Sequence, residues 1–177
     1  MNLNINLNSN SNTPLSSVLK KIQETANTPF EKAHPIPAEA NHSIEFYNHE
    51  CHKVFMSEWI CIGREDEIPN VGDYLTHDIA GVPILIVRQK SKEITGFVNA
   101  CAHRFTCLVA KTSGNARSFT CPYHAWTYNL DGTLKSAPFM KMKEGFNLND
   151  HRLQKLYAEV WEGFIYVTLA ETSVRSV

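Results

Sequence analysis

The pattern of hydrophobic and polar residues divides the chain into a helical N-terminal part and a longer part of short strands. Apolar residues in Leu15–Thr25 recur three or four positions apart, which predicts a short amphipathic helix. Three prolines in Thr28–His42 predict an extended arm, and helical spacing returns in Ser43–Trp59, where a second helix is expected. Residues 1–13 are rich in Asn, and this composition at a chain terminus predicts a disordered tail.

From Trp59 onward, short runs rich in β-branched and aromatic residues alternate with turn residues. Val82–Arg88 is almost wholly apolar and predicts a core strand. Asp131-Gly132 between two such runs indicates a hairpin, and Ser113-Gly114-Asn115 indicates a turn. Together these runs predict a mainly β fold, a sandwich of short antiparallel strands. The predicted strands cover residues 59–63, 73–79, 82–88, 94–99, 118–120, 126–130, 133–135, 156–160 and 164–169.

These elements predict one folded domain with additions at both ends. At 177 residues, the chain is long enough to bury a hydrophobic core. The predicted organisation is a flexible or extended N-terminal arm with a short helix at residues 1–42, a β domain at residues 43–170, and a tail at residues 171–177.

Composition and charge narrow the classes of function. A formal net charge of −1 gives no electrostatic footprint for nucleic acid or an anionic membrane, so neither is expected as a partner. No apolar run approaches the length of a membrane span, and no signal peptide is predicted. The five cysteines are an odd number with spacing unlike a disulfide framework, which favours reduced thiols and a cytoplasmic location. Three of them, Cys51, Cys61 and Cys107, are expected to be buried free thiols.

Two short motifs carry the candidate chemistry, Cys101-Ala102-His103 and Cys121-Pro122-Tyr123-His124. There are 17 residues between His103 and Cys121, and each motif supplies one thiolate and one imidazole. Thiolates select iron–sulfur clusters or zinc, and imidazole suits both iron and zinc. The residues alone therefore leave open a [2Fe–2S] centre and a structural zinc site. In either case the candidate ligands are Cys101, His103, Cys121 and His124, within a metal-binding part of about residues 99–135.

Two further residues near the second motif have expected roles. Trp126, two positions beyond His124, is expected to cover the metal centre, to pack in the core of the hairpin, or both. His151 is the only histidine after His124 and is expected to be a solvated turn residue.

The two motifs closely resemble those of Rieske [2Fe–2S] proteins. The sequence around them resembles α subunits of Rieske non-haem iron oxygenases of the ring-hydroxylating type, and the similarity covers about residues 43–169. It implies a Rieske-type β-sandwich in which two hairpin loops form a cluster-binding subdomain. The similar segments are MSEWICIGREDEIPNVGDYLT (56–76), ITGFVNACAHR (94–104), FTCPYHAWTYNLDGTL (119–134) and EVWEGFIYVTL (159–169).

The resemblance also implies ligand roles and a function. By this similarity, Cys101 and Cys121 hold the buried iron of the cluster, and His103 and His124 hold the outer iron. The domain would receive single electrons from a reductase or ferredoxin and pass them to the mononuclear iron of an oxygenase catalytic domain, in a neighbouring subunit or a separate chain. Both dioxygenases and monooxygenases fit this expectation. No catalytic iron site is expected within the chain, so its own enzymatic activity stays open. A stand-alone Rieske-type ferredoxin is the alternative, and a zinc-stabilised binding module is a more distant one.

Some positions depart from related sequences. The family commonly has Gly where Phe105 stands, and Phe105 is not expected to adopt the positive torsions that Gly allows. Respiratory Rieske proteins place a Ser two residues after the last ligand histidine, where this chain has Trp126. Hydroxyl donors to the cluster sulfurs raise the potential, so we predict a potential near the low end of the roughly −150 to +300 mV range of Rieske centres. The extra disulfide of respiratory Rieske proteins is not expected for Cys107, because Tyr123 stands at its partner's position.

Overall fold

The computed structural model describes residues 14–140 and 142–170. These residues form two compact units, and the chain passes from one to the other between Val54 and Phe55. The sequence placed the domain boundary earlier, after residue 42, and that boundary stays a prediction. The tails predicted at residues 1–13 and 171–177 lie outside the described residues.

The N-terminal unit is helical. Helix α1 (Leu15–Ala26) confirms the amphipathic helix predicted from the spacing of apolar residues, and it buries Val18 completely. The arm that follows is not continuously extended, because it contains two 3-10 helices, Phe30–Lys32 and Ala38–Asn41. A proline stands immediately before each one, and its fixed φ favours the start of a helical turn. The prediction of a simple extended arm is wrong at these two turns.

A second helix, α2 (Ile44–Glu50), is followed directly by a π-helical turn at Cys51–Phe55. The side-chain oxygen of Ser43 caps α2 by accepting a hydrogen bond from the N–H of Phe46 at 3.2 Å. The helix was predicted to extend to Trp59, but it ends earlier because the chain becomes extended where the first strand begins. Within the described part of the chain, no helix combines the length and apolar character needed to cross a bilayer.

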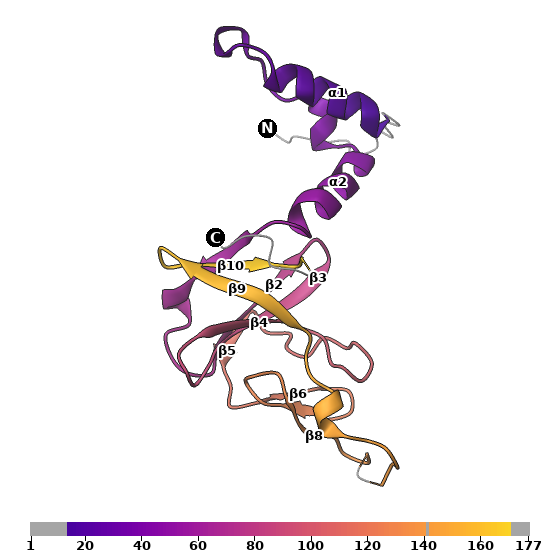
Figure 1. Cartoon of the computed structure of the whole chain (residues 1–177), viewed down its shortest axis with the longest axis vertical. Helices are drawn as coiled ribbons and strands as arrows, with labels where there is room; N and C mark the ends of the chain where they lie inside the picture. The colour runs from indigo at the N-terminus through magenta and orange to yellow at the C-terminus, as the bar shows by residue number, and fades with distance from the viewer. Residues whose placement is uncertain (1–13, 141, 171–177) are drawn as a thin grey trace, which may run out of the picture. The chain divides into compact units, whose positions relative to one another are not determined.

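The second unit is built on a seven-stranded sheet in the order β1-β10-β9-β4-β3-β2-β5, with a three-stranded sheet β6-β7-β8 (Figure 1). Neighbouring strands run antiparallel throughout. The predicted mainly β fold of short antiparallel strands is confirmed. The strands are β1 (Ile60–Arg64), β2 (Asp73–Ile79), β3 (Val82–Arg88), β4 (Ile94–Val98), β5 (Ser113–Asn115), β6 (Phe119–Thr120), β7 (Thr127–Tyr128), β8 (Leu134–Ser136), β9 (Lys155–Trp161) and β10 (Phe164–Thr168).

Strand β3 lies inside the sheet and separates two hydrophobic cores. Its four central residues, Ile84, Leu85, Ile86 and Val87, are all fully buried. Successive side chains of a strand point to opposite faces, so Leu85 and Val87 enter one core while Ile84 and Ile86 enter the other. This is why the sequence shows a continuous apolar run here instead of alternation.

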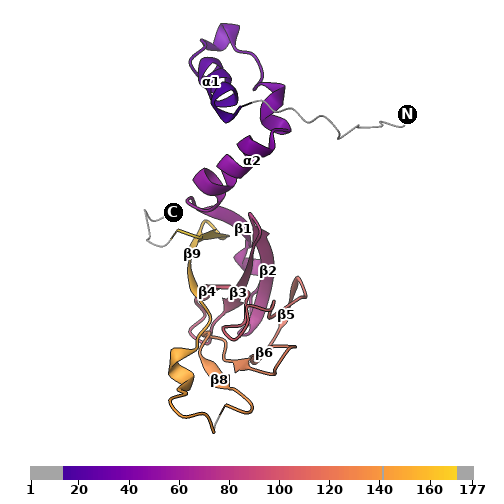
Figure 2. The ribbon, with the colours of Figure 1, turned by 90° about the vertical axis from the view of Figure 1, so that its right-hand side faces the viewer.

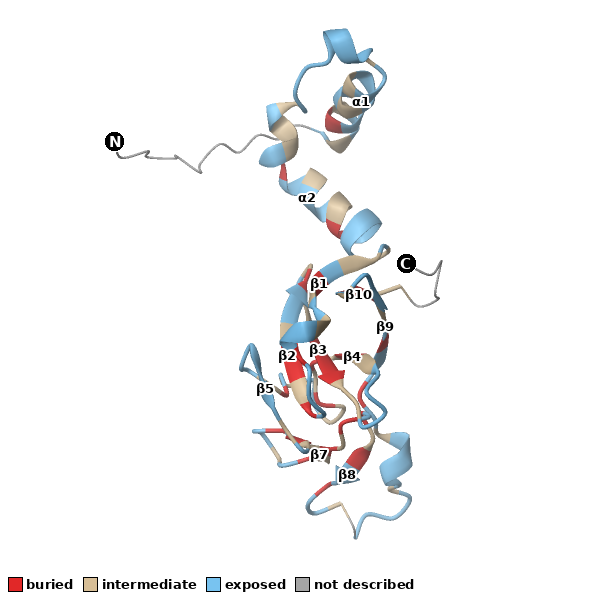
Figure 3. Ribbon diagram, turned by 90° about the vertical axis from the view of Figure 1, so that its left-hand side faces the viewer, coloured by how far each residue is buried: buried red, intermediate tan, exposed pale blue. Residues whose placement is uncertain are grey.

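The two cores have different surroundings. The large sheet curls so that β9 faces β2 and β3 (Figure 2), and buried segments lie both on strands that line this interior and around β7 and β8 (Figure 3). We call the core within the curl the sheet core, and the core on the other face of β3, which contains both motif cysteines, the motif core. The sheet core consists of Ile62, Ile68, Leu75, Ile79, Ile84, Ile86, Leu156, Ile165 and Val167. The motif core includes Tyr74, Leu85, Val87, Phe97, Cys101, Leu108, Phe119, Cys121, Trp126, Tyr128, Leu130, Leu134 and Leu153.

The segment Ser113–Asn115 was predicted as a turn, but it is the edge strand β5, paired with β2. Gly114 lies opposite Tyr74, and a Cβ at this position would come within 2.7 Å of the Tyr74 hydroxyl oxygen. The glycine therefore leaves room for a tyrosine ring against the strand. The prediction was wrong because Ser-Gly-Asn has turn composition, while the reason for the glycine is a packing contact with a distant residue.

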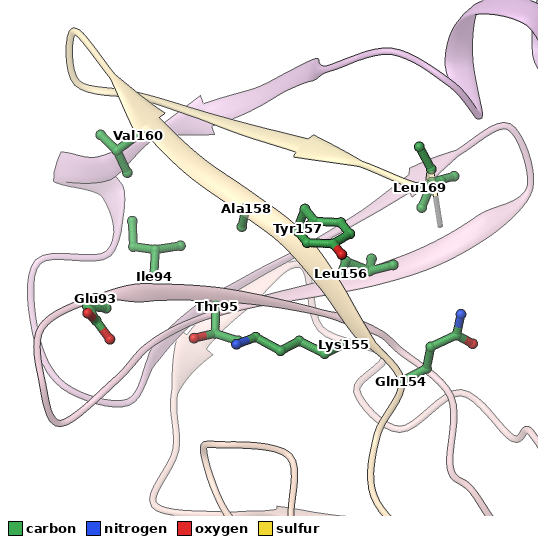
Figure 4. A pocket seen from close by; sticks show the side chains of 11 residues that line it. Glu93, Ile94, Thr95, Gln154, Lys155, Leu156, Tyr157, Ala158, Val160 and Leu169 are labelled. Carbon is green, nitrogen blue, oxygen red and sulfur yellow. The ribbon is translucent and has the colours of Figure 1, made fainter. Parts of the chain in front are cut away.

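Strands β4 and β9 pair only at Gly96–Leu156 and Phe97–Lys155. A cavity of about 750 Å³ opens between these strands (Figure 4). Residues of both strands line it, among them Ile94 and Val160. No cysteine or histidine contributes to its lining, so the cavity is separate from the candidate metal ligands.

Candidate metal centre

The first motif folds into a loop that begins at Cys101 and closes at Thr106. The N–H of Cys101 donates to the carbonyl oxygen of Thr106 at 2.9 Å, and the N–H of Phe105 donates back to the carbonyl oxygen of Cys101 at 2.8 Å. Just outside the loop, Ala100 and Cys107 form an isolated antiparallel bridge. The loop is therefore the tip of a hairpin that follows β4.

The second motif folds into a loop with the same backbone frame, at the tip of the β6–β7 hairpin. The N–H of Cys121 donates to the carbonyl oxygen of Trp126 at 2.8 Å, and the N–H of Ala125 donates back to the carbonyl oxygen of Cys121 at 3.0 Å. In each loop the cysteine comes first, and the histidine lies between it and the residue that bonds back to it. The expected pair of hairpin loops is confirmed.

Phe105 and Ala125 occupy equivalent positions in the two loops, and both have a φ of 55°. The expectation that Phe105 would not adopt a positive torsion is therefore wrong. A left-handed conformation costs an L residue roughly 1–2 kcal/mol. The hydrogen bond from each N–H to the cysteine carbonyl compensates, and the Phe105 side chain avoids a clash because it is 81% exposed.

The two motif cysteines lie together in the motif core. Cys101 is 1% exposed and Cys121 is 3% exposed. Burial raises the pKa of the Cys101 thiol, and the neighbouring Cys121 raises it further, while hydrogen bonds from Tyr128 and from the backbone N–H of His103 lower it. Ionisation of both thiols would place two negative charges close together in a buried site, which is unfavourable. A metal cation between them would remove that penalty.

Tyr128, on β7, is a residue of the site that the sequence analysis missed. Its hydroxyl oxygen accepts a hydrogen bond from the N–H of Ala102 at 3.0 Å and lies 3.2 Å from the Sγ of Cys101. The ring is fully buried, and burial raises the pKa of the phenol well above its usual value. The phenol therefore keeps its proton, and it donates to Cys101 when the cysteine is a thiolate.

The two motif histidines form a pair of their own. The ring centroids of His103 and His124 are 4.7 Å apart, with planes at 69°. Burial lowers the pKa of His103, and the neighbouring His124 and Arg104 lower it further, which favours the neutral imidazole that binds metal. The Nδ1 atom of His124 is buried and has no hydrogen-bond partner. Such an atom costs about 1–3 kcal/mol unless it is bonded, and a metal would supply that bond.

The arrangement of donors fits a two-iron cluster. The thiols pair with each other and the imidazoles pair with each other. A Rieske centre needs two Cys on one iron and two His on the other, whereas a structural zinc site needs four ligands around one ion.

Trp126 covers His103 and also belongs to the motif core, so both expected roles apply. It is 3% exposed, and its ring stacks on His103 with centroids 4.8 Å apart and planes at 12°. His151 contacts the edge of the same indole at 5.3 Å and stacks on Phe146 at 4.7 Å. His151 directly follows a 3-10 turn and is half-buried, and the prediction of a solvated residue is wrong in that its ring packs against two aromatic rings.

Asn99 is a second residue of the site that the sequence did not reveal. It is 2% exposed, its side-chain oxygen accepts from the N–H of Val109 at 2.9 Å, and its amide donates to the carbonyl oxygen of Val109 at 2.7 Å. These two bonds close the base of the first loop in the way that a paired strand residue would.

The other three cysteines form no disulfide, as predicted, because all five cysteines are free. Cys51 is buried as expected. The expectation of buried thiols is wrong for Cys61 and Cys107, which are exposed. Cys107 still uses its thiol as a donor, to the carbonyl oxygen of Val109 at 3.4 Å.

Comparison with known proteins agrees with this geometry. The model of the Rieske [2Fe–2S] domain family matches residues 58–155. The α subunit of biphenyl 2,3-dioxygenase from Rhodococcus jostii (strain RHA1) is 36% identical over 121 residues, which are 68% of this chain and 26% of the relative. The oxygenase subunit of carnitine monooxygenase from Escherichia coli (strain K12) is 32% identical over 139 residues, which are 78% of this chain and 37% of the relative. The chain thus spans well under half the length of these relatives.

Solved structures show the same similarity. Naphthalene 1,2-dioxygenase from Rhodococcus sp., bound to indole, superposes with a TM-score of 0.77 and 27% identity, over 88% of this chain and 35% of that chain. The apo form of a quaternary ammonium Rieske monooxygenase superposes with a TM-score of 0.74 and 33% identity, over 81% of this chain and 42% of that chain.

Proposed function

Because the chain belongs to the Rieske [2Fe–2S] domain family, whose cofactor is a Rieske-type [2Fe–2S] cluster, we propose that Cys101 and Cys121 bind one iron and that His103 and His124 bind the other. The observation that carries this proposal is the pairing of like ligands by two loops with one backbone frame. The buried, unpartnered Nδ1 of His124 supports it further.

The general role of such a domain is electron transfer, and the chain is homologous to oxygenase α subunits. We infer that it takes single electrons from a reductase or a ferredoxin and passes them to the mononuclear iron of an oxygenase catalytic domain. The exposure of the ligands supports exchange with a partner on the histidine side of the site. His103 and His124 are half-buried whereas both cysteines are almost completely buried, so the histidines are the accessible side of the site.

The cluster, when bound, supplies a centre that accepts and releases one electron. The surrounding residues of the chain control its environment. Trp126, which is 3% exposed and stacks on His103, excludes water from that face of the imidazole. Tyr128 holds a proton against the sulfur of Cys101 and so stabilises negative charge there.

The acceptor is proposed to be the catalytic domain of a Rieske oxygenase, in a neighbouring subunit or a separate chain. The relatives named as a dioxygenase and a monooxygenase support this class. The helical N-terminal unit also favours an oxygenase component over a stand-alone Rieske-type ferredoxin, because a minimal electron carrier needs neither α1 nor α2.

The first test is the visible and EPR spectrum of the purified protein before and after reduction with dithionite, together with its iron and zinc content. We expect a red-brown oxidised protein with two irons per chain and a rhombic signal of low average g after reduction. A colourless, EPR-silent protein that contains zinc would contradict the proposal and support the zinc-stabilised module.

The ligand roles are tested with matched pairs of variants. Cys101→Ala and His124→Ala are each expected to abolish the EPR signal. Their controls, Cys61→Ala and His77→Ala, change exposed residues of the same types outside the ligand loops and are expected to keep it. Loss of the signal in a control, or its full retention in a ligand variant, would show that the assignment is wrong.

The direction of electron flow needs a separate experiment. The reduced protein is mixed in a stopped-flow instrument with the oxidised catalytic module of a Rieske oxygenase, and its reoxidation is followed by absorbance without oxygen. Rapid single-electron transfer supports the oxygenase role. Reoxidation only by other electron carriers would favour the stand-alone ferredoxin.

A further inference from the structure

Four aromatic rings, those of His103, Trp126, Phe146 and His151, form a contact network, and His103 in turn contacts the ring of His124. Trp126 stacks on the His103 imidazole, with planes at 12°. Phe146 and His151 both meet Trp126 at steep angles, 69° and 70°, with centroids 5.7 Å and 5.3 Å away. Phe146 and His151 are in turn stacked on each other, at 4.7 Å and 15°. One ring of this network is thus a proposed iron ligand, and the other three hold no metal.

The two rings that contact Trp126 from its other sides belong to one short segment, which has little regular secondary structure. Between Phe146 and His151 the chain forms only one 3-10 turn, Leu148–Asp150. The stacking of the two rings brings the ends of this turn together against the indole. Edge-to-face and stacked arrangements are the preferred geometries of aromatic pairs, so each ring limits the rotation of the next.

The second histidine has no comparable backing. The ring of His124 contacts the ring of His103 edge-to-face at 4.7 Å and the ring of its neighbour Tyr123 at 3.8 Å, but Tyr123 is 56% exposed and no buried indole stacks on His124 in the described residues. His103 instead rests on an indole that is 3% exposed and is contacted by two further rings. The two proposed ligands of the same iron therefore differ in how firmly their planes are held.

We propose that His151 is a positioning residue, which together with Phe146 clamps Trp126 against His103 and so fixes the plane of this imidazole. The ring of His151 contacts the indole, which stacks on His103, so its effect on the plane of the imidazole passes through Trp126. The orientation of an imidazole plane governs how its nitrogen shares unpaired spin with iron, so a fixed plane gives a narrow distribution of nitrogen couplings. This inference rests on the ligand roles proposed above.

The test uses the full chain with its cluster, reduced with dithionite, and measures the nitrogen hyperfine couplings of the two histidine ligands by pulsed EPR. In His151→Ala, we expect the coupling of one ligand nitrogen to broaden while the other keeps its wild-type width. His151→Phe, which restores an aromatic ring, is expected to restore the narrow coupling. His77→Ala changes an exposed histidine of β2 and is expected to match the wild type.

Three outcomes would overturn the inference: unchanged couplings in His151→Ala, broadening of both couplings equally, or failure of His151→Phe to restore the narrow one. If His151→Ala does not retain its cluster, Phe146→Leu removes the other half of the clamp and must produce the same selective broadening; unchanged couplings in that variant would also overturn it. Failure of the proposed function looks different, because the wild-type protein would then lack the low-g signal altogether.

Discussion

The two ligand loops share one backbone frame but are supported by different parts of the fold. The second loop lies at the tip of the β6–β7 hairpin, where Phe119 pairs with Tyr128 and the hydroxyls of Thr120 and Thr127 are 3.0 Å apart. The first loop follows β4 and is closed by a single isolated bridge. Its support comes from the buried side chain of Asn99 and from the hydroxyl of Tyr128.

This difference shows that one local geometry can be produced either by a strand ladder or by buried polar side chains. A ladder distributes its hydrogen bonds over many backbone groups, whereas a buried side chain concentrates them in one residue. The first loop should therefore be the more sensitive of the two to single side-chain substitutions, and the predictions below test this asymmetry.

The largest effect is expected for Asn99→Ala. The substitution removes two hydrogen bonds to Val109 and leaves its N–H and carbonyl without these partners, which should lower the free energy of unfolding by about 2–3 kcal/mol. Urea unfolding followed by circular dichroism measures the change. The matched variant in the second loop, Thr120→Val, breaks an exposed hydroxyl pair and should cost no more than about 0.5 kcal/mol. Equal costs would contradict the proposed asymmetry.

A pH dependence is expected from Tyr128. Its pKa is raised in the folded protein, chiefly by burial, so the phenolate is disfavoured there relative to the unfolded chain. The resulting stability is fully present below the unfolded pKa of about 10 and is lost as pH rises above it, by about 1.4 kcal/mol per pH unit for one proton. Unfolding midpoints between neutral and strongly alkaline pH should fall more steeply for the wild type than for Tyr128→Phe. Parallel curves would show that another group controls alkaline unfolding.

Tyr128→Phe should also lower the reduction potential. The hydroxyl donates to the sulfur of Cys101, and this donation favours the more negative, reduced state. Loss of about 1 kcal/mol of differential stabilisation corresponds to roughly 40 mV for one electron. Protein-film voltammetry measures the shift, with Tyr157→Phe on β9 as the control that should leave the potential unchanged. This hydroxyl should raise the potential above the low value predicted from Trp126, because that prediction did not include a hydroxyl donor at the site.

The sequence predicted best what depends on local pattern. The strand Val82–Arg88 was predicted with its observed bounds, because a short, continuous apolar run rich in β-branched residues is typical of a buried strand. The order and spacing of the two motifs likewise suggested both loops, because each loop is closed by backbone hydrogen bonds within six residues.

The sequence failed where the reason for a residue lies far along the chain. Gly114 is needed by Tyr74, Tyr128 bonds to Cys101, and His151 packs on Trp126. None of these contacts leaves a periodic pattern, so a packed glycine was predicted as a turn and a half-buried histidine was predicted as solvated. The prediction for Phe105 was wrong for another reason. It relied on the intrinsic preference of L residues for negative φ, but the hydrogen bonds of the loop compensate the cost of a positive φ, which is roughly 1–2 kcal/mol.

The smallest predicted effect tests the common frame itself. Phe105→Gly and Ala125→Gly each place glycine at a φ of 55°, which relieves strain but adds freedom to the unfolded chain. We expect each to raise the free energy of unfolding by about 0.5–1 kcal/mol, since the two positions have the same torsion and the same hydrogen bond. Ala110→Gly, where φ is not positive, should instead lower it slightly. Thermal unfolding of the three variants decides the matter. A gain in stability for Phe105→Gly alone would mean that the two loops share a backbone geometry but not its strain. The β6–β7 strand pairing around the second loop would then already compensate the strain at Ala125.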